Sequence, residues 1–253
     1  MKTLRDTWLV FQRNLGLTLR NPAWSVIGVV QPLLYLLLFA PLLKSIATAQ
    51  GFPSGGAYNV FVPGLLIQLG LFGAAFVGFS LIAEVRYGVV ERLQVTPVSR
   101  LALLLGRALR DVLILLIQSL MLVLLSLPFG LDIHPAGLLV VLGLLALIGL
   151  LMASCSYALA LWLKSEDALA PFLTTVTLPL LLLSGVLLPL SLAPAWLRHI
   201  AAFNPLAYAV DAARAIFNDH LGDTSVIKGI AITAALAIIA LVVSARSFGR
   251  TVA

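Results

Sequence analysis

Six long runs of apolar residues divide the chain, separated by shorter polar or charged segments. Each run has close to the ~20 residues that an α-helix needs to cross the hydrocarbon core of a bilayer. The pattern therefore predicts an all-α polytopic membrane protein with six transmembrane helices. The predicted spans are residues 25–43, 60–83, 112–130, 138–163, 169–188 and 226–245.

The first 24 residues show a different pattern. Apolar residues such as Leu4, Trp8 and Leu19 recur at helical spacing on one face, and the charged residues lie largely off that face. This pattern predicts a cytoplasmic interfacial amphipathic helix, ended by Asn21 and Pro22, whose arginines face anionic lipid headgroups. The alternative is a helix packed on another protein. The first unit is therefore residues 1–24, and the transmembrane domain is 25–253.

Basic residues are distributed unevenly between the two sides of the membrane. With both termini in the cytoplasm, 12 of the 16 Lys and Arg residues fall in cytoplasmic segments and 4 in extracellular ones. Cytoplasmic loops carry the excess of Lys and Arg in membrane proteins. We therefore expect a multi-pass protein of the bacterial cytoplasmic (inner) membrane with both termini in the cytoplasm.

Composition agrees with this topology. The chain is 61% hydrophobic and only 10% charged, whereas soluble domains are about 25% charged. The net charge of +6 sits at the ends of apolar runs rather than on one stripe, which disfavours a nucleic-acid partner. Cys155, the single cysteine, excludes an internal disulfide.

The long charged segment between the second and third runs predicts a short helix over residues 84–94 that ends at Thr96 and Pro97. Ser99 is placed to cap the next helix. Arg107 and Asp111 have the i, i+4 spacing of an ion pair at the membrane surface.

The segment 189–225 is largely apolar, but its helix-like stretches are too short to cross a bilayer. Asn204 followed by Pro205 is a typical helix start. We expect two short helices that enter the outer leaflet.

The sequence lacks several kinds of chemistry. The predicted spans contain no ionisable residue near their middle, where ion-coupled carriers place one. The sequence has no G-x-x-x-x-G-K-[ST] phosphate loop. His134, His199 and His220 are too far apart to indicate a metal site, and no span contains a histidine to pair with Ser184 in an intramembrane enzyme. An ion-coupled or passive transporter and a non-transporting assembly subunit remain alternatives.

Polar residues within the spans have two interpretations, helix packing or a substrate path. The candidates for the path are Gln31, Gln68, Gln118, Tyr157, Thr174 and Thr177. Gly70, Ala74 and Gly78 form a small-residue face that favours close helix packing.

Two motifs resemble the type-2 ABC exporter permeases, the daunorubicin-resistance and nodulation-export group. The first is EVRYGVVERLQVTPVSR at residues 84–100, and the second is SGVLLPLSLAPAWLRHIAAFNPLAYAVDAAR at 184–214. Tyr87 and Val89 stand where the family has a more polar pair. In the second motif the candidate residues are Pro189, Pro194, Trp196, Asn204, Pro205, Tyr208 and Arg214.

The resemblance implies a transport subunit with no catalytic site, moving a drug, lipid or glycolipid outward. It implies a separate ABC-type ATPase in two copies that binds ATP and Mg, and a second permease, identical or related. Residues 84–100, called the coupling segment below, are implied to contact that ATPase. The implied coupling residues are Glu84, Arg86, Tyr87, Gly88, Glu91, Arg92, Leu93, Thr96, Pro97, Ser99 and Arg100.

Overall fold

The structure, a computed structural model, describes residues 2–20, 23–46, 56–89, 98–187 and 189–251. Regular secondary structure in these ranges is entirely helical, which confirms the predicted all-α class. The elements are α1 (Lys2–Arg20), α2 (Ala23–Ile46), α3 (Gly56–Ala75), α4 (Gly78–Arg86), α6 (Arg100–Ser126), η1 (Leu127–Phe129), α7 (Pro135–Leu163), α8 (Glu166–Leu182), η2 (Leu190–Leu192), α9 (Ala195–Ala201), α10 (Pro205–Phe217) and α11 (Thr224–Thr251).

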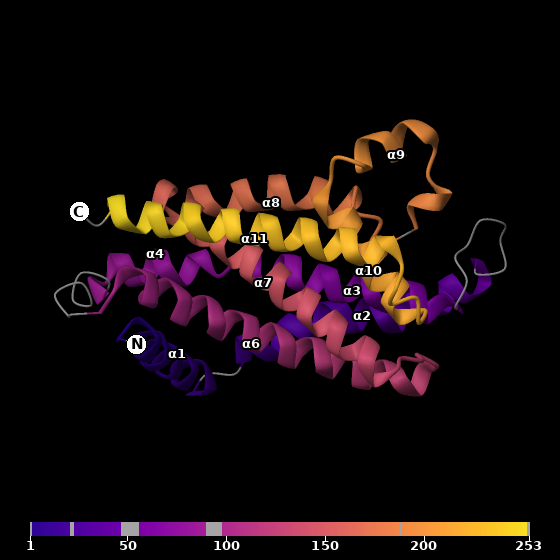
Figure 1. Cartoon of the computed structure of the whole chain (residues 1–253), viewed down its shortest axis with the longest axis horizontal. Coiled ribbons are helices and arrows are strands. Elements are labelled where there is room, and N and C mark those ends of the chain that lie inside the picture. The colour runs from indigo at the N-terminus through magenta and orange to yellow at the C-terminus, as the bar shows by residue number, and fades with distance from the viewer. Residues whose placement is uncertain (1, 21–22, 47–55, 90–97, 188, 252–253) are drawn as a thin grey trace.

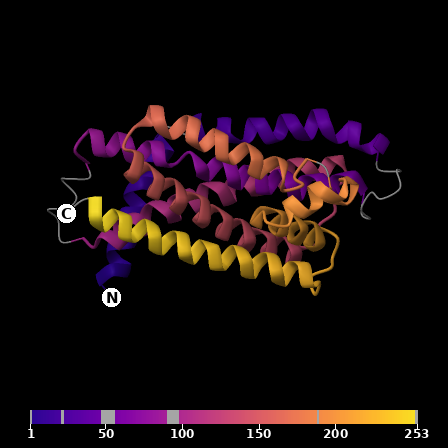
Figure 2. The ribbon, with the colours of Figure 1, turned by 90° about the horizontal axis from the view of Figure 1, so that it is seen from above.

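The long helices form one bundle around α3 and α7. Helix α7 packs against α3, α6 and α11, while α1 lies along α6. Figure 1 shows α1 and α6 along one side of the bundle and α8 and α11 along the other. Figure 2 shows α2 and α11 on opposite sides. Both termini, the end of α4 and the start of α6 lie at one end, called the terminal end below (Figure 1).

Four stretches of the described chain are long and apolar enough to cross a membrane: Ala57–Arg86, Leu101–Phe129, Pro135–Leu163 and Thr224–Phe248. The protein is therefore a multi-pass membrane protein. Helix α8 has 17 residues, and the apolar stretch described within α2 is Val26–Leu38. These two correspond to the remaining predicted spans, so the number six stays a prediction.

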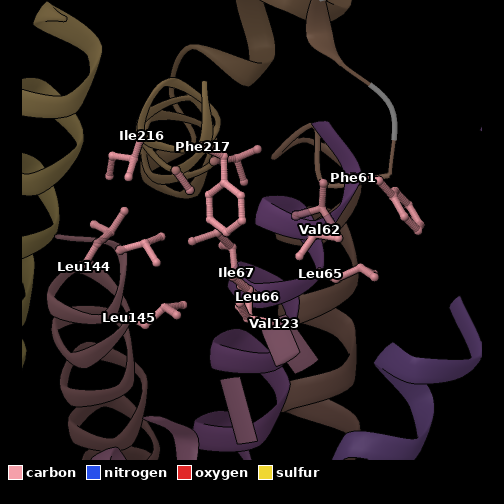
Figure 3. Close-up of a cluster of buried hydrophobic side chains, with 14 of the residues drawn as sticks. Phe61, Val62, Leu65, Leu66, Ile67, Val123, Leu144, Leu145, Ile216 and Phe217 are labelled. Carbon is pink, nitrogen blue, oxygen red and sulfur yellow. The ribbon is translucent and has the colours of Figure 1, made fainter. Parts of the chain in front are cut away.

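The main core lies between α3, α6, α7 and α10. Figure 3 shows Phe61, Leu65, Leu144 and Ile216 among the side chains gathered there. Residues 60–71 of α3 are all buried. In a bilayer, lipid tails are as apolar as leucine, so helices associate through close van der Waals packing. Gly70 serves this packing, since a Cβ there would lie 3.0 Å from Ile148 Cγ2 of α7.

The predicted span 60–83 is interrupted, which the sequence pattern did not indicate. Helix α3 ends at Ala75, and α4 begins at Gly78 after a turn. Ser156 of α7 holds this turn: its Oγ donates to the carbonyl of Ala75 and accepts from the N–H of Gly78 at 2.9 Å. A side chain 78 residues away thus replaces backbone hydrogen bonds that a continuous helix would make.

Helix α6 begins at Arg100 and continues into the predicted third span, residues 112–130. Ser99 caps it as expected, accepting from the N–H of Ala102 at 3.2 Å. The helix extends through Arg107 and Asp111 because these charges find partners on neighbouring helices, described below.

Both short helices predicted in 189–225 are present as α9 and α10. Asn204 caps α10, since its Oδ1 accepts from the N–H of Leu206 at 3.0 Å, with Pro205 in the first turn. Figure 1 shows α9 standing off the bundle. In contrast, most of α10 is buried against α3, α7 and α11.

Helix α1 carries two faces. Thr7, Val10 and Asn14 are buried, and α1 packs on α6. Leu4 and Trp8 of the predicted lipid face are exposed. One face of α1 therefore packs on α6 of the same chain. Its other, apolar face, with Leu4 and Trp8, stays exposed in the described part of the chain.

Candidate functional site

Charged residues of α4 and α6 gather at the terminal end of the bundle. Arg107 Nη2 donates to Glu84 Oε2, and their side chains are 4% and 26% exposed. Arg110 Nε lies 3.1 Å from Asp111 Oδ1, and Tyr157 of α7 donates its hydroxyl to Asp111 Oδ2. We call these five residues the charged cluster; with two arginines and two carboxylates it is formally neutral.

The charged cluster corrects the predicted pairing of Arg107 with Asp111. Each of the two is instead in an ion pair with another residue, Glu84 or Arg110. Burying an ion requires a partner and hydrogen bonds, because desolvation is expensive. The i, i+4 spacing could not show that Glu84, 23 residues before Arg107, would supply that partner.

A cavity of about 690 Å³ lies beside the charged cluster, and we call it the charged cavity. Helices α1, α2, α3, α4 and α6 and the turn between α3 and α4 all contribute to its walls. Its lining residues are Asn14, Leu17, Thr18, Gly28, Gly73, Phe76, Val77, Phe79, Ser80, Glu84, Arg110, Asp111, Ile114, Leu115 and Gln118.

A second cavity of about 610 Å³ lies between α2 and α3, nearer the middle of the bundle, and we call it the apolar cavity. Most of its lining is aliphatic or aromatic, with two glutamines among the polar groups. Its lining residues are Ile27, Gly28, Val30, Gln31, Pro32, Leu34, Tyr35, Leu38, Gln68, Leu69, Phe72, Gly73 and Phe76.

The two cavities share Gly28, Gly73 and Phe76. Gly73 keeps this junction open, because the nearest atom to a Cβ there, Gln118 Oε1, would be 3.9 Å away. Phe76 also belongs to an aromatic row along the walls, with ring centroids 6.4 Å from Phe72 and 5.9 Å from Phe79. The result is a groove that is charged at the terminal end and apolar farther in.

Three of the six predicted path residues line this groove: Gln31 and Gln68 the apolar cavity, and Gln118 the charged cavity. Buried Gln68 Oε1 has no hydrogen-bond partner among the described residues. The other three line neither cavity. Tyr157 belongs to the charged cluster, Thr177 is buried in α8, and Thr174 is exposed.

The coupling segment is described only at its two ends. Arg86 Nη1 lies 3.4 Å from Glu166 Oε1 of α8. Tyr87 is exposed, and Gly88 takes a left-handed conformation with φ 66° that ends the helical stretch. Ser99 and Arg100 begin α6. The predicted helix 84–94 is interrupted, because α4 ends at Arg86 and a turn follows at Tyr87 and Gly88. Residues 90–97, which include Glu91, Arg92, Leu93, Thr96 and Pro97, lie outside the described residues.

The second predicted motif surrounds α9 and α10. Pro189 and Pro194 precede η2 and α9, and Trp196 is exposed on α9. The hydroxyl of Tyr208 donates to the carbonyl of Ala202 at 2.9 Å.

Arg214 of the second motif is buried, and its partners are backbone carbonyls. Its Nε donates to Val60 O at 3.0 Å, and its Nη2 donates to Gly185 O at 2.6 Å. Asn204 Nδ2 similarly donates to Leu180 O at 2.7 Å. These bonds tie α10 to α3 and to the end of α8.

Sequence reasoning missed the site roles of Arg110, Asp111 and the aromatic row. The available signal was a cluster of charges inside a helix that is otherwise apolar, since such residues usually face partners or a cavity. The phenylalanines gave no such signal, because aromatic residues at helical spacing are common in any apolar span.

Comparison with known proteins identifies the class. The ABC-2 type transporter family model matches residues 5–218. A protein named transport permease ycf38 from Pyropia yezoensis is 34% identical over 204 residues, covering 79% of this chain and 69% of the relative. This multi-pass helical chain is an ABC transporter permease subunit.

The chain belongs to the ABC-2 type transporter family. Two further relatives are named for drug resistance. The doxorubicin resistance ABC transporter permease protein DrrC of Mycobacterium tuberculosis (strain CDC 1551 / Oshkosh) is 27% identical over 195 residues, 75% of this chain and 69% of the relative. The daunorubicin resistance ABC transporter permease protein DrrB1 of Streptomyces coeruleorubidus is 26% identical over 204 residues, 77% of this chain and 68% of the relative.

Proposed function

We propose that this permease subunit exports an amphipathic substrate and that the substrate moves along the groove formed by the two cavities. The observation that carries the proposal is the gradient along this groove. Its terminal end presents Glu84, Arg110 and Asp111, and its inner part is lined by apolar side chains with Gln31 and Gln68. Ligand sites are typically apolar with a few placed polar groups, and an amphipathic molecule matches both halves.

The driving force comes from a separate ABC ATPase, in two copies, that binds ATP and Mg. The absence of a phosphate loop in this sequence supports that division of labour. In the assembly a second permease, the same or a related chain, completes the transporter. ATP-driven closure of the ATPase pair moves the coupling segment, and the helices then shift as rigid bodies by alternating access.

The membrane is the bacterial cytoplasmic membrane, with both termini in the cytoplasm. The bias of Lys and Arg supports this orientation, which places the terminal end of the bundle and its charged cavity at the cytoplasmic surface. The exposed side chains of Leu4 and Trp8 then contact lipid as an interfacial helix does.

A transport assay tests the proposal. The permease is purified with its ABC ATPase, reconstituted in vesicles, and supplied with doxorubicin, a probe suggested by the names of two relatives. ATP should drive doxorubicin from the ATPase side to the opposite side. Transport at the same rate without ATP, or in vesicles that contain the permease alone, would contradict the proposal.

A second experiment tests the coupling segment. Exchanging the charges at two neighbouring positions, Glu91→Arg together with Arg92→Glu, preserves the net charge but reverses its local arrangement. We expect this variant to lose co-purification with the ATPase, or ATP-driven transport, while the permease still folds. Normal co-purification and normal export would exclude the proposed contact.

A further inference from the structure

The charged cavity has an unusual polar wall for a membrane protein. Glu84, Arg110 and Asp111 line it together, so both signs of charge face one space of about 690 Å³. Arg107 supplies the second positive charge. It pairs with Glu84 but does not line the cavity. The two ion pairs, Glu84 with Arg107 and Arg110 with Asp111, therefore carry no net formal charge, and the cavity wall presents both a positive and a negative group.

The ion pairs leave hydrogen-bonding capacity directed at the cavity. Glu84 accepts from Arg107 through Oε2, and its side chain is 26% exposed. Arg110 Nε lies 3.1 Å from Asp111 Oδ1 but makes no hydrogen bond to a described residue, and Arg110 Nη1 reaches Thr18 Oγ1 at a long 3.4 Å. The Arg110 side chain is 18% exposed, compared with 3% for Asp111. The carboxylate of Glu84 and the guanidinium of Arg110 are thus both partly exposed at the wall of the cavity, where a ligand can reach them.

Electrostatics selects the charge of that ligand. A net charge brought into a low-dielectric site is costly unless it meets an uncompensated opposite charge. An anionic group alone would approach Glu84 and Asp111 as well as Arg110, and a cationic group alone would approach Arg110. A zwitterion satisfies both faces of the wall and adds no net charge.

Much of the remaining lining of the cavity is apolar and indicates that the ligand also carries an apolar chain. Leu17, Ile114 and Leu115 also line the charged cavity, and Phe76 and Gly73 continue into the apolar cavity. An apolar chain attached to a headgroup at Arg110 would therefore extend along the aromatic row. Helix α1, which supplies Asn14, Leu17 and Thr18, forms the remaining wall.

We propose that the charged cavity binds the headgroup of a zwitterionic amphiphile, with the ammonium group at Glu84 and the anionic group at Arg110. This inference rests on the proposed function, because it names the chemical class that the same groove takes. The amphiphile can be a membrane lipid or an exported compound, and the shared chemistry is the paired ammonium and phosphate or carboxylate.

A binding experiment without ATP tests the inference. The permease, purified with its ABC ATPase, is titrated with three fluorescent single-chain amphiphiles of equal chain length. Their headgroups are phosphoethanolamine, phosphoglycerol and a primary amine, which are zwitterionic, anionic and cationic at neutral pH. We expect the phosphoethanolamine probe to bind about tenfold more tightly than either of the others.

Two variants localise the binding. Arg110→Gln removes the cation that lines the cavity and should weaken phosphoethanolamine binding about tenfold. Arg198→Gln makes the same charge change at an exposed side chain of α9 that lines neither cavity, and should leave binding unchanged. Arg110→Lys keeps the positive charge, so it tests the site even if Arg110→Gln fails to fold. We expect its affinity to lie between those of the parent and Arg110→Gln.

Equal binding of the three probes, tighter binding of a singly charged probe, or full binding by Arg110→Gln would overturn the inference. A free phosphoethanolamine head without a chain should compete poorly, which separates an amphiphile site from a simple anion site. The measurement involves no transport, so loss of headgroup preference and loss of ATP-driven export are separate results.

Discussion

At the scale of single residues, Arg214 is a buried charge whose partners lie far away in the sequence. Arg214 donates to the carbonyls of Val60 and Gly185, which are 154 and 29 residues from it. The turn that offers one of these carbonyls contains Gly185, in a left-handed conformation with φ 74°. The sequence could single out Arg214 only through a family resemblance, because carbonyl acceptors leave no mark in the side-chain pattern.

Replacing Arg214 should destabilise the bundle. Arg214→Met keeps much of the length but leaves the buried carbonyls of Val60 and Gly185 without their donor, at an expected cost of about 3 kcal/mol. Thermal unfolding of the purified protein in detergent would measure the loss. Arg198→Met, an exposed change on α9, is the matched control and should be nearly neutral. Equal unfolding temperatures for the two variants would refute the role of Arg214.

The Glu84–Arg107 pair allows a second test at this scale. Glu84→Gln leaves the Arg107 charge buried without a full counter-charge, and we expect a loss of about 3 kcal/mol. The double variant Glu84→Gln with Arg107→Met removes the stranded charge and should recover part of that loss. A double-mutant cycle by chemical unfolding gives the coupling energy. Additive effects would show that the two side chains do not interact.

At the scale of elements, local signals predicted where helices start, and tertiary contacts decided the rest. Ser99 and Asn204 cap their helices as their types and positions indicated. The break between α3 and α4 depends on Ser156 of another helix, so no window of sequence around residue 76 contains its cause.

The attachment of α1 to α6 is a feature of this scale. A Cβ at Gly106 would lie 2.7 Å from Val10 Cβ and 2.9 Å from the backbone oxygen of Thr7, so the two helices meet at a glycine. The polar residues on the buried face of α1 bond to their own helix: Thr7 Oγ1 donates to Thr3 O and Asn14 Nδ2 to Val10 O, both at 2.8 Å. These bonds satisfy polar groups that burial would otherwise penalise.

Gly106→Leu should separate α1 from α6, because the backbone of Thr7 cannot move aside independently of the helix. We expect faster tryptic cleavage after the exposed residue Arg13, followed by mass spectrometry of the purified protein. Gly143→Leu is the control, since a Cβ at Gly143 meets no atom within 4 Å. Cleavage at the parental rate in Gly106→Leu would contradict this packing.

At the scale of the whole molecule, the sequence indicated the class of protein and the helical bundle but not the groove. Gln31, Gln68 and Gln118 were visible as polar residues in apolar spans, and the fold brings them to the walls of two adjoining cavities. Thr174 and Thr177 looked equivalent in sequence and line neither cavity. Which polar residue faces a cavity is decided by how helices rotate against one another, and periodicity alone does not specify that rotation.

The junction between the cavities offers a test at this scale. Gly73→Leu places a side chain in the open space beside Gln118, so it should obstruct the groove without disturbing the packed core. We expect ATP-driven doxorubicin export to fall at least about tenfold, the loss produced by about 1.4 kcal/mol. Co-purification with the ATPase should be unchanged, and Gly143→Leu should export normally. Parental export by Gly73→Leu would show that the substrate does not pass residue 73.

The ion pair between Glu84 and Arg107 fastens α4 to α6. Glu84 lies in the last turn of α4 and Arg107 lies near the start of α6, so one side-chain contact joins the two helices. Both helices border the charged cavity. A displacement of either helix at this contact is therefore transmitted to the other helix, at the wall of that cavity.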